Sequence, residues 1–417
     1  MFRIHIYLNF LKFIKAFFFY RKRSFLKSKI SQIISSQSKK QKLIFSSQCR
    51  VSFLFLLKYL KQKKKLKNEI IFSSYNLPEM VNVAKNLNFK VRYCDLNFEN
   101  GFIDVNKLKS LISKKTSAVV LTNMFNSYKD SKKIKKITKK LKIDLIEDNA
   151  IYFDNYTKID NKKYYSGSIG DYTIYSFNIM KNVSAMYGGA LATNNKEFIN
   201  YYKSQTDGLP NLSKNLIFKQ SLIFLILKIM GIQLLYKTIF FSIIKFAHEN
   251  NIKILLKLFY PSLKFKIIDF PKSYFSKISN FSLKLIYLQL IDKQKRVKDF
   301  NSRKNNNIYY YKLLSKIKNK NFRLIEIEDF NYQNFIDFPI IIKNKEKFNK
   351  YLLKQGIEAR YIYYRDCERI FQSKNFKCKN SNLFEKELLC LPNNKRVNYT
   401  HINKIVKYTR IFLSKKD

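Results

Sequence analysis

Short apolar runs alternate with lysine-rich amphipathic runs from about Ile70 onward. The apolar runs are rich in β-branched and aromatic residues and are bounded by polar turn residues, which is typical of strands. The predicted strands are residues 69–74, 90–96, 117–123, 143–149, 172–178 and 188–193. Runs with helical spacing, such as residues 131–141, lie between the earlier ones. This alternation predicts an α/β fold with a mainly parallel central sheet and helices on its faces, over residues 31–208.

The pattern changes after residue 208. Residues 221–246 are strongly apolar, but Lys228, Lys237 and Lys245 interrupt them. A helix that spans a bilayer needs about 20 mostly apolar residues and tolerates a central lysine poorly. We therefore expect residues 209–275 to form an interfacial or buried helical insertion rather than a membrane span.

Residues 276–417 are expected to form a connecting helix and a smaller C-terminal α+β domain. Apolar residues recur with helical spacing through residues 282–314, which predicts one long helix. Beyond it the pattern predicts a strand, a helix that stops at Gly356, and a second strand. These three elements are expected at residues 335–344, 345–356 and 357–364.

The first 30 residues mix aromatic with basic side chains, including Arg3, Lys12, Lys15 and the cluster Arg21–Arg23. No uninterrupted apolar core ends in a small-residue cleavage site, so the pattern does not indicate a signal peptide. It favours a basic amphipathic helix, which could lie on a membrane or pack against the protein. The sequence leaves both readings open.

The composition adds a large positive charge. The chain of 417 residues has a formal net charge of +52, which would suit nucleic acid or an anionic membrane. However, Lys, Asn, Ile, Phe and Tyr are all abundant while Trp is absent, so much of the charge reflects a bias that acts along the whole chain. No zinc-finger or basic-zipper spacing accompanies the lysines, so the pattern does not favour a nucleic-acid partner. The hydrophobic share of 46% excludes a disordered protein.

The cysteines and histidines restrict the chemistry. The five cysteines are an odd number without a CxxC pair, so neither a disulfide framework nor a zinc site is indicated, and a reducing cytoplasm fits best. The three histidines, His5, His248 and His401, stand in no recognisable motif. We therefore expect no metal site and no histidine base.

A lysine and a carboxylate follow two of the predicted strands. Asp148 stands at the carboxyl end of the strand at 143–149, and Lys181 comes just after the strand at 172–178. Ligands of open parallel sheets collect beyond the carboxyl ends of the strands, so both side chains can reach one crevice. A lysine that forms a Schiff base with pyridoxal phosphate, and a carboxylate that keeps its pyridine nitrogen protonated, would use this arrangement. Ser176 could bind the phosphate.

Each residue alone has an ordinary explanation as well. Most lysines of this chain are expected on the surface, and an aspartate after a strand is often a turn former or a helix cap. The order and spacing of the three residues add weight, because "LIEDNA", "GSIGDYTIYSFNIMKN" and "YGGALAT" resemble segments of the DegT/DnrJ/EryC1/StrS aminotransferases. These are pyridoxal-phosphate enzymes that act on nucleotide-linked keto sugars. The likeness covers residues 41–207 and 276–413.

The resemblance implies specific roles. Lys181 would be the Schiff-base lysine, Asp148 the partner of the pyridine nitrogen and Ser176 a phosphate ligand. It also implies the type I aminotransferase fold, with its larger cofactor-binding domain and smaller C-terminal domain. A homodimer with the active site at the subunit interface, and glutamate as the usual amino donor, belong to the same expectation.

Several positions depart from the family pattern. Ile151 stands where the family generally has Gln or His. Cys49, Arg50 and Val51 replace a phosphate-binding turn that usually has Gly followed by Thr or Arg, and Arg50 could partly compensate.

Two further positions concern the cofactor ring and the partner subunit. Tyr75 and Asn76 are both candidates for the residue over the pyridine ring. Ser273, Tyr274 and Phe275 stand where many members have an Asn-Tyr-Arg run contributed across the dimer.

The sequence thus predicts a cytoplasmic aminotransferase of nucleotide-linked keto sugars, for surface polysaccharide or related glycan biosynthesis. Lys181 favours transamination, because relatives that dehydrate sugars typically carry His at that position. Peripheral contact with the inner membrane face, through the N-terminal helix and the insertion, is an open hypothesis. The alternative is a non-catalytic, membrane-associated protein that retains the aminotransferase fold.

Overall fold

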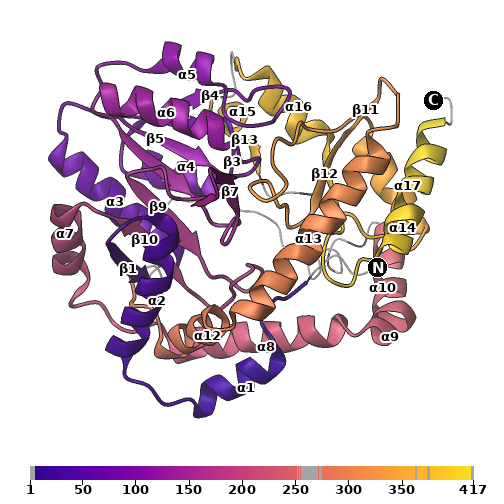
Figure 1. Ribbon diagram of the computed structural model, residues 1–417, viewed down its shortest axis with the longest axis horizontal. Coiled ribbons are helices and arrows are strands. Elements are labelled where there is room, and N and C mark those ends of the chain that lie inside the picture. Colours follow the sequence, from indigo (N-terminus) through magenta and orange to yellow (C-terminus); the bar gives the residue numbers. More distant parts are fainter. Residues whose placement is uncertain are drawn as a thin grey trace.

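A seven-stranded sheet forms the centre of the larger part of the molecule (Figure 1). The computed structural model describes residues 5–250, 252, 254, 271, 275–361, 364–372 and 376–414. The sheet has the order β1-β10-β9-β6-β5-β2-β4. Its strands are β1 (Lys42–Ser46), β2 (Glu69–Ser73), β4 (Lys90–Cys94), β5 (Thr116–Thr122), β6 (Asp144–Asp148), β9 (Tyr172–Ser176) and β10 (Gly189–Thr193). All six predicted strands are therefore confirmed, whereas β1 was not predicted.

The sheet is mainly parallel, as expected. Four neighbouring pairs, from β4 to β9, run parallel, and only β10 runs antiparallel to its neighbours β9 and β1. Because the parallel strands share one direction, β5, β6 and β9 place their carboxyl ends at the same edge of the sheet. The loops that follow these strands build the site described below.

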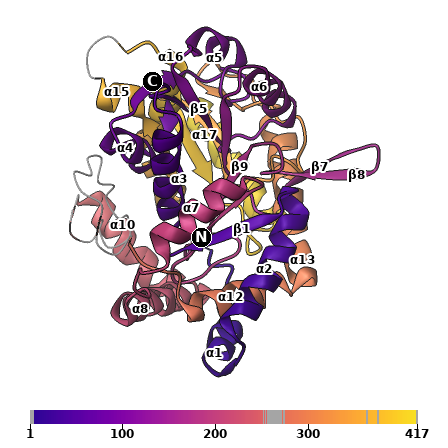
Figure 2. The same ribbon diagram turned by 90° about the vertical axis from the view of Figure 1, so that its left-hand side faces the viewer.

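Helices cover both faces of the sheet (Figure 2). Alternate residues of a strand point to opposite faces, so Ile70 and Phe72 of β2 pack under one layer and Ile71 under the other. The first layer comprises α3 (Cys49–Lys63), α4 (Pro78–Asn86) and α7 (Lys196–Thr206). The second comprises α2 (Arg23–Ser38), α5 (Val105–Leu111), α6 (Tyr128–Lys140) and α12 (Asn280–Leu290). The hairpin of β7 (Tyr156–Ile159) and β8 (Lys162–Tyr165) extends from this part.

The predicted connecting helix is two helices, not one. α12 ends at Leu290, and α13 (Lys293–Leu314) begins after Asp292. The Asp292 carboxylate accepts a hydrogen bond of 3.1 Å from the Lys295 amide, so it caps the second helix. The cap satisfies an amide that would bond within the helix if the helix continued. The apolar spacing runs on across the break, so the sequence pattern predicted one helix.

A second, antiparallel sheet forms the centre of the C-terminal part, with the order β11-β12-β14. Its strands are β11 (Phe322–Arg323), β12 (Phe338–Ile342) and β14 (Leu388–Leu391), and its helices are α14 (Lys345–Lys354), α15 (Cys367–Phe371), α16 (Lys379–Glu387) and α17 (Tyr399–Ser414). Gly356 follows α14 with φ +81°, as the predicted helix stop requires. This α+β unit agrees with the prediction.

The strand predicted at residues 357–364 is wrong for the residues that the structure describes there. Arg360 exchanges two backbone hydrogen bonds with Cys390, of 2.8 and 2.9 Å, as an isolated bridge. Residues 362 and 363 lie outside the described part. The chain then forms β13 (Arg365–Asp366), which pairs with β3 (Tyr75–Asn76) and so ties the C-terminal part to the larger one.

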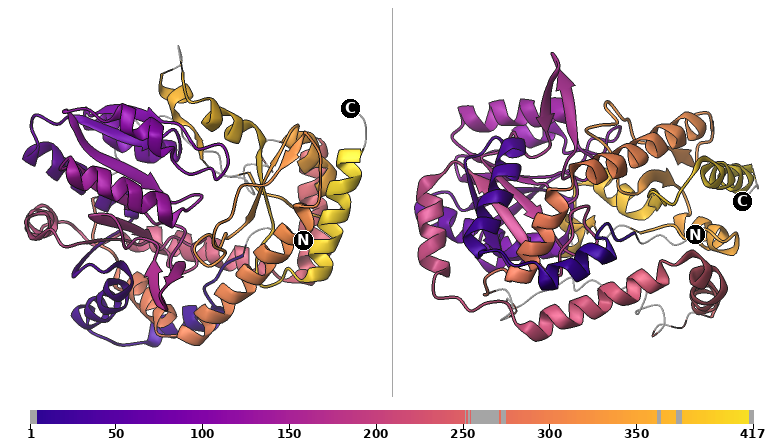
Figure 3. Two further views of the ribbon diagram at one scale, coloured as in Figure 1. Left: turned by 45° about the horizontal axis from the view of Figure 1, so that its top comes forward. Right: turned by 60° about the horizontal axis from the view of Figure 1, so that its bottom comes forward.

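The N-terminal region and the apolar insertion lie together along one side of the molecule (Figure 3). α1 (Phe10–Phe18) packs on α12, and α8 (Lys214–Met230) runs beside it. α9 (Gln233–Leu235), the π-helical segment η1 (Tyr236–Phe240) and α10 (Phe241–Glu249) continue from α8 to the C-terminal part. Within the described residues, no single helix is long and apolar enough to cross a membrane; Lys214–Met230 and Gln233–Glu249 pass that test only as a pair bent by 77°. The domain limits at residues 30, 208 and 275 stay predictions.

Candidate active site

The predicted lysine and aspartate follow neighbouring strands. Asp148 is the last residue of β6, and Ser176 is the last residue of the adjacent parallel strand β9. Lys181 lies in the loop between β9 and β10. Its amide donates a hydrogen bond of 2.9 Å to the Asn178 carbonyl, and its own carbonyl accepts a hydrogen bond from the Ser184 hydroxyl. These bonds fix the backbone from which the lysine side chain extends.

A cavity of about 230 Å³ lies at this edge of the sheet. Lys181, Asp148, Ser176, Cys49 and Arg50, which are far apart in the sequence, all line it. The remaining lining residues are Leu77, Glu79, Met80, Met124, Phe125, Ala150, Ile151, Tyr152, Asn178, Met180, Phe335, Ile336, Asp337, Pro339, Arg360, Tyr364 and Cys390. The cavity therefore lies between the large sheet and the C-terminal part. Five of the seven residues singled out from the sequence meet in it.

Lys181 and Asp148 are close enough to change each other's protonation. Burial lowers the pKa of the Lys181 ammonium, and the charges of Arg360 and Arg50 lower it further, while Cys49 and Asp148 oppose this shift. Burial raises the pKa of the Asp148 carboxyl, against the charge of Lys181 and a hydrogen bond of 3.1 Å from the Ala150 amide. A lysine in such surroundings loses its proton at a lower pH than an exposed one.

The amino end of α3 forms another wall of the cavity. Cys49 and Arg50 are its first two residues, and the side chain of the preceding residue, Gln48, does not cap the helix. The exposed amides and the helix dipole make such an end a favourable place for an anion. Gly189 of β10 permits the approach, because a β-carbon there would lie 2.2 Å from the Cys49 nitrogen. Val51, which also departs from the family pattern, is buried in the core below this end.

Arg50 brings positive charge to the same wall. Its guanidinium forms an ion pair with Glu79 and donates a hydrogen bond of 3.2 Å to the Gln48 side chain. Both Arg50 and Glu79 line the cavity. The pair holds the guanidinium next to the amino end of α3, so the two features can act on one anion.

Tyr75 and Asn76 are not among the residues that line the cavity. Asn76 is buried and donates a hydrogen bond of 2.7 Å to the Thr122 hydroxyl. The Tyr75 ring packs at 5.9 Å from the ring of Tyr364, which itself lines the cavity. Leu77, the next residue in the chain, does line it. The structure thus places Leu77 and Tyr364 on the cavity surface and the two candidates behind it.

Sequence reasoning also missed the wall contributed by the C-terminal part. Arg360 donates a hydrogen bond of 2.8 Å to Asp337, and both line the cavity. Neither residue was a candidate, although the family likeness covers both segments, because only the folded chain brings them to Lys181. A smaller cavity, lined by His5 and Tyr7 among others, shares Met180, Ile336, Asp337 and Arg360 with the main one. The N-terminal segment therefore flanks the site.

The remaining departures are placed as follows. Ile151 lines the cavity and packs against a neighbouring apolar cluster, so it adds an apolar surface where a polar side chain was expected. Phe275 packs near the α3 layer, with the Lys58 ammonium 5.6 Å from its ring. Ser273 and Tyr274 lie outside the described residues.

Comparison with known proteins identifies the family. The model of the DegT/DnrJ/EryC1/StrS aminotransferase family matches residues 38–212 and 272–410, which leaves out the segment that holds α8, α9, η1 and α10. Helicobacter pylori PseC, an aminotransferase involved in the biosynthesis of pseudoaminic acid, superposes with a TM-score of 0.69 at 16% identity, over 97% of this chain and 95% of PseC. The sugar aminotransferase CalS13 from Micromonospora echinospora gives 0.70 at 12% identity, over 98% and 99%. The expected type I aminotransferase fold is thereby confirmed.

Curated relatives match over shorter stretches. The chain is 28% identical over 170 residues to the GDP-4-keto-6-deoxy-D-mannose 3-dehydratase of Yersinia pseudotuberculosis, which is 41% of this chain and 40% of the relative. It is 31% identical over 117 residues to the UDP-4-amino-4,6-dideoxy-N-acetyl-beta-L-altrosamine transaminase of Campylobacter jejuni, which is 27% of this chain and 30% of the relative. The aligned stretches span less than half of these relatives. Because the family model covers most of the sequence, the chain belongs to the DegT/DnrJ/EryC1/StrS aminotransferase family.

Proposed function

We propose that the protein is a pyridoxal-phosphate-dependent aminotransferase that transfers an amino group, with glutamate as donor, to a nucleotide-linked keto sugar. The observation that carries this proposal is the meeting of Lys181 and Asp148, from neighbouring strand ends, in one cavity. Family membership supports it. The glycan made from the product would belong to a surface polysaccharide or a related polymer, and the reaction would take place in the cytoplasm.

The residues of the cavity fit pyridoxal phosphate. The cofactor needs an amine for its aldehyde, a carboxylate for its ring nitrogen and a cradle for its phosphate. We assign these functions to Lys181, to Asp148, and to the amino end of α3 with Cys49, Arg50 and Ser176. We place Leu77 and Tyr364 next to the ring, with Tyr75 and Asn76 supporting them from behind. When bound, the cofactor supplies an electron sink that stabilises negative charge on the substrate carbon.

Lys181 is the proposed acid and base. Its lowered pKa means that the amine is available in its neutral form at a lower pH than an ordinary lysine, so it can accept a proton from the donor carbon and return it later. Asp148, as an anion, would hold the proton at the ring nitrogen. Arg360 and Arg50 add positive charge to a cavity whose substrates carry carboxylates and phosphates. The apolar surface of Ile151 and Leu77 excludes water from the reacting atoms.

A half-reaction tests the proposal. Purified protein incubated with pyridoxal phosphate should gain a visible absorbance band, which glutamate should bleach while 2-oxoglutarate appears. Lys181→Ala should lack the band, and Lys133→Ala, at an exposed position on α6, should keep it. A protein that never acquires the band would support the non-catalytic alternative and contradict the proposal.

The second half-reaction tests the substrate class. Glutamate-treated protein should regain the band with a nucleotide-linked keto sugar from a panel, and an amino sugar should form. Loss of water from the sugar without uptake of nitrogen would assign a dehydratase instead. A homodimer with a shared active site is part of the proposal, and the mass of the protein in solution would measure it.

A further inference from the structure

α1 exposes an apolar face on the side away from the core. Phe13 and Ala16 are buried, whereas residues at positions i, i+4, i+7 and i+8 from Phe10 are exposed. This spacing puts them on one side of the helix. The exposed set is Phe10, Leu11, Ile14, Phe17 and Phe18, of which Phe18 is 85% and Leu11 73% exposed. An exposed apolar stripe of this kind usually marks a surface that binds another protein or a membrane.

The insertion continues this face. On α8, Phe224 is fully buried, and the opposite side exposes Phe218, Leu222, Ile223, Ile226 and Ile229. Between residues 231 and 246, the exposed large apolar residues are Ile232, Leu234, Ile239, Ile243 and Phe246. The family model does not match this segment.

The two faces lie on one side of the molecule. The rings of Phe13 on α1 and Phe224 on α8 are 4.7 Å apart, so the helices touch through their buried sides. Figure 3 shows α1 and α8 side by side in the view that brings the bottom of the molecule forward. The exposed apolar faces of α1 and α8 therefore lie on either side of the line along which the two helices touch. We call these faces together the docking surface; it comprises the exposed apolar residues of α1 and of residues 214–246.

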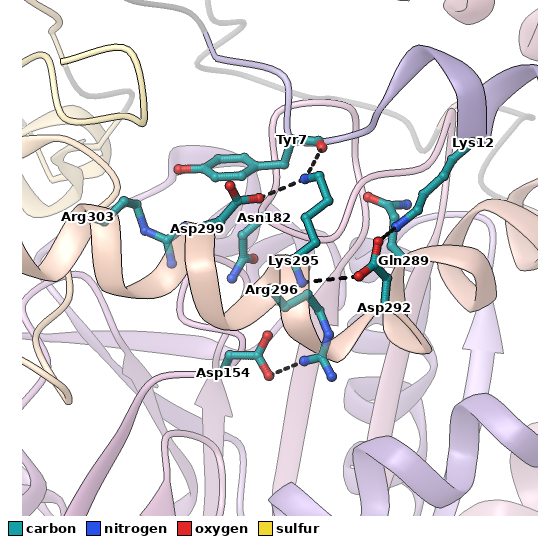
Figure 4. A pocket seen from close by; sticks show the side chains of 10 residues that line it. All are labelled: Tyr7, Lys12, Asp154, Asn182, Gln289, Asp292, Lys295, Arg296, Asp299 and Arg303. Atoms are coloured by element: carbon teal, nitrogen blue, oxygen red, sulfur yellow. Dashed lines mark hydrogen bonds and ion pairs between the residues drawn. The ribbon is translucent and has the colours of Figure 1, made fainter. Parts of the chain in front are cut away.

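Polar contacts hold α1 in this orientation. Figure 4 shows the cluster between the N-terminal segment and α13, in which Lys12 forms an ion pair with Asp292. Lys295 bonds the Tyr7 carbonyl at 3.3 Å and Asp299 at 2.8 Å. The Arg303 guanidinium lies 5.2 Å from the centre of the Tyr7 ring. Because the inner side is fixed to α13, the apolar side cannot turn inward without breaking these contacts.

The segments that carry the docking surface, α1 and residues 214–246, have basic but no acidic side chains, and the carboxylate of Asp292 beside α1 is paired with Lys12. The first acidic residue of the chain is Glu69, and none lies between Asp207 and Glu249. The basic residues of α1, α2, their connection and the insertion helices are Lys12, Lys15, Arg21, Lys22, Arg23, Lys27, Lys29, Lys214, Lys219, Lys228, Lys237 and Lys245. Apolar side chains on one face with lysine and arginine beside them, and no carboxylates, are typical of helices that lie in a bilayer interface.

We propose that the docking surface binds the interface of an anionic phospholipid bilayer, with α1 and α8 lying in its plane. Aromatic and aliphatic side chains of both helices enter the acyl boundary, while Arg21, Lys22 and the lysines beside them meet the headgroups. A second copy of the chain is the competing occupant. A symmetric contact would set two surfaces of the same positive charge against each other, which an anionic lipid surface does not.

Vesicle flotation of the full chain tests this inference. The protein should float with vesicles of phosphatidylcholine and phosphatidylglycerol and much less with phosphatidylcholine alone. Phe18→Asp with Leu222→Asp should lower the partition coefficient by about tenfold or more, because two large apolar side chains are lost from the bilayer. Arg21→Gln with Lys22→Gln should lower binding to the anionic vesicles by about tenfold. Both pairs are exposed, and circular dichroism should show unchanged folding.

Matched controls keep the test specific. Leu66→Asp changes a residue that is 91% exposed in the turn after α3, and Lys139→Gln with Lys140→Gln removes two charges at the end of α6; neither should change flotation. Equal binding to both kinds of vesicle would overturn the choice of an anionic bilayer. If the Phe18→Asp, Leu222→Asp variant floated like the wild type but had a lower molecular mass in solution, the surface would instead bind a second copy of the chain. The result does not depend on transaminase activity, so either proposal can fail alone.

Discussion

A β-carbon on Gly189 would lie 2.2 Å from the backbone nitrogen of Cys49 and 2.4 Å from the Gln48 carbonyl carbon. The amino end of α3 can therefore approach β10 only because residue 189 has no side chain. This approach brings the helix end next to Ser176, which pairs with Gly189 in the sheet. The proposed phosphate cradle therefore depends on the absence of a side chain at residue 189.

Gly189→Ala should displace the start of α3. We expect a loss of about 1–3 kcal/mol in the free energy of unfolding, as for other overpacked positions, and weaker binding of pyridoxal phosphate. Denaturant unfolding and cofactor titration measure the two effects. Gly208→Ala is the control, because an added β-carbon there meets no atom within 4 Å. If the variant bound pyridoxal phosphate as tightly as the wild type, the amino end of α3 would not be part of the cofactor site.

The protonation of Lys181 should respond in opposite directions to its two kinds of neighbour. Asp148 raises the pKa of the lysine and Arg360 lowers it, so Asp148→Asn should shift the pKa down and Arg360→Gln should shift it up. The neutral amine is the form that reacts with an aldehyde. The pH midpoint for the rate of cofactor uptake by the cofactor-free protein should therefore move to lower pH in the first variant and to higher pH in the second. Shifts of the same sign would contradict the electrostatic account.

Lys40 should make the stability of the protein depend on pH. Its side chain is buried, donates hydrogen bonds to the Ser38 and Gly167 carbonyls at 3.1 and 2.9 Å, and has a pKa lowered by burial to about 8. Between about pH 8 and 10.5 the unfolded chain binds this proton and the folded chain does not, so the free energy of unfolding rises with pH. Relative to Lys40→Met, the wild type should gain about 3 kcal/mol over that range, measured by urea unfolding. A constant difference would show that Lys40 is not perturbed.

The hydrogen bond between Ser74 and Asp366 should help to fasten the C-terminal part. The Ser74 hydroxyl donates to the Asp366 carboxylate at 2.7 Å, and both residues are buried. Ser74→Ala should cost about 1–3 kcal/mol in unfolding free energy, because a buried carboxylate loses a donor. Ser36→Ala, at an exposed position on α2, should cost less than about 0.5 kcal/mol. Equal effects in the two variants would show that the contact contributes nothing special.

Much of the larger part could be predicted because its strands are buried and local in sequence. Continuous apolar runs such as 117–123 and 143–149 can satisfy their backbone only inside a sheet. The pairing of Asp148 with Lys181 followed from the rule that parallel strands share one carboxyl edge. β1 was missed because its apolar residues merge with those of α3 in the sequence.

The rest depends on contacts between distant segments. Residues 357–364 have the composition of a strand, but Arg360 meets Cys390 at a single bridge and then lines the cavity. The segment from Tyr75 to Leu77 shows the same limit. Tyr75 and Asn76 could not be ranked by sequence; both pair with β13 and neither lines the cavity, whereas Leu77, the next residue, does.

The wall shared by the two cavities affects any shortened form of the chain. His5 and Tyr7 stand beside Asp337 and Arg360, and Phe13 covers Phe224 and Phe281. A fragment that lacks the first helix would leave one side of the cavity open and would expose the rings of Phe224 and Phe281 to water. Low activity of such a fragment would then reflect the open side of the cavity, because Lys181 and Asp148 would still be present.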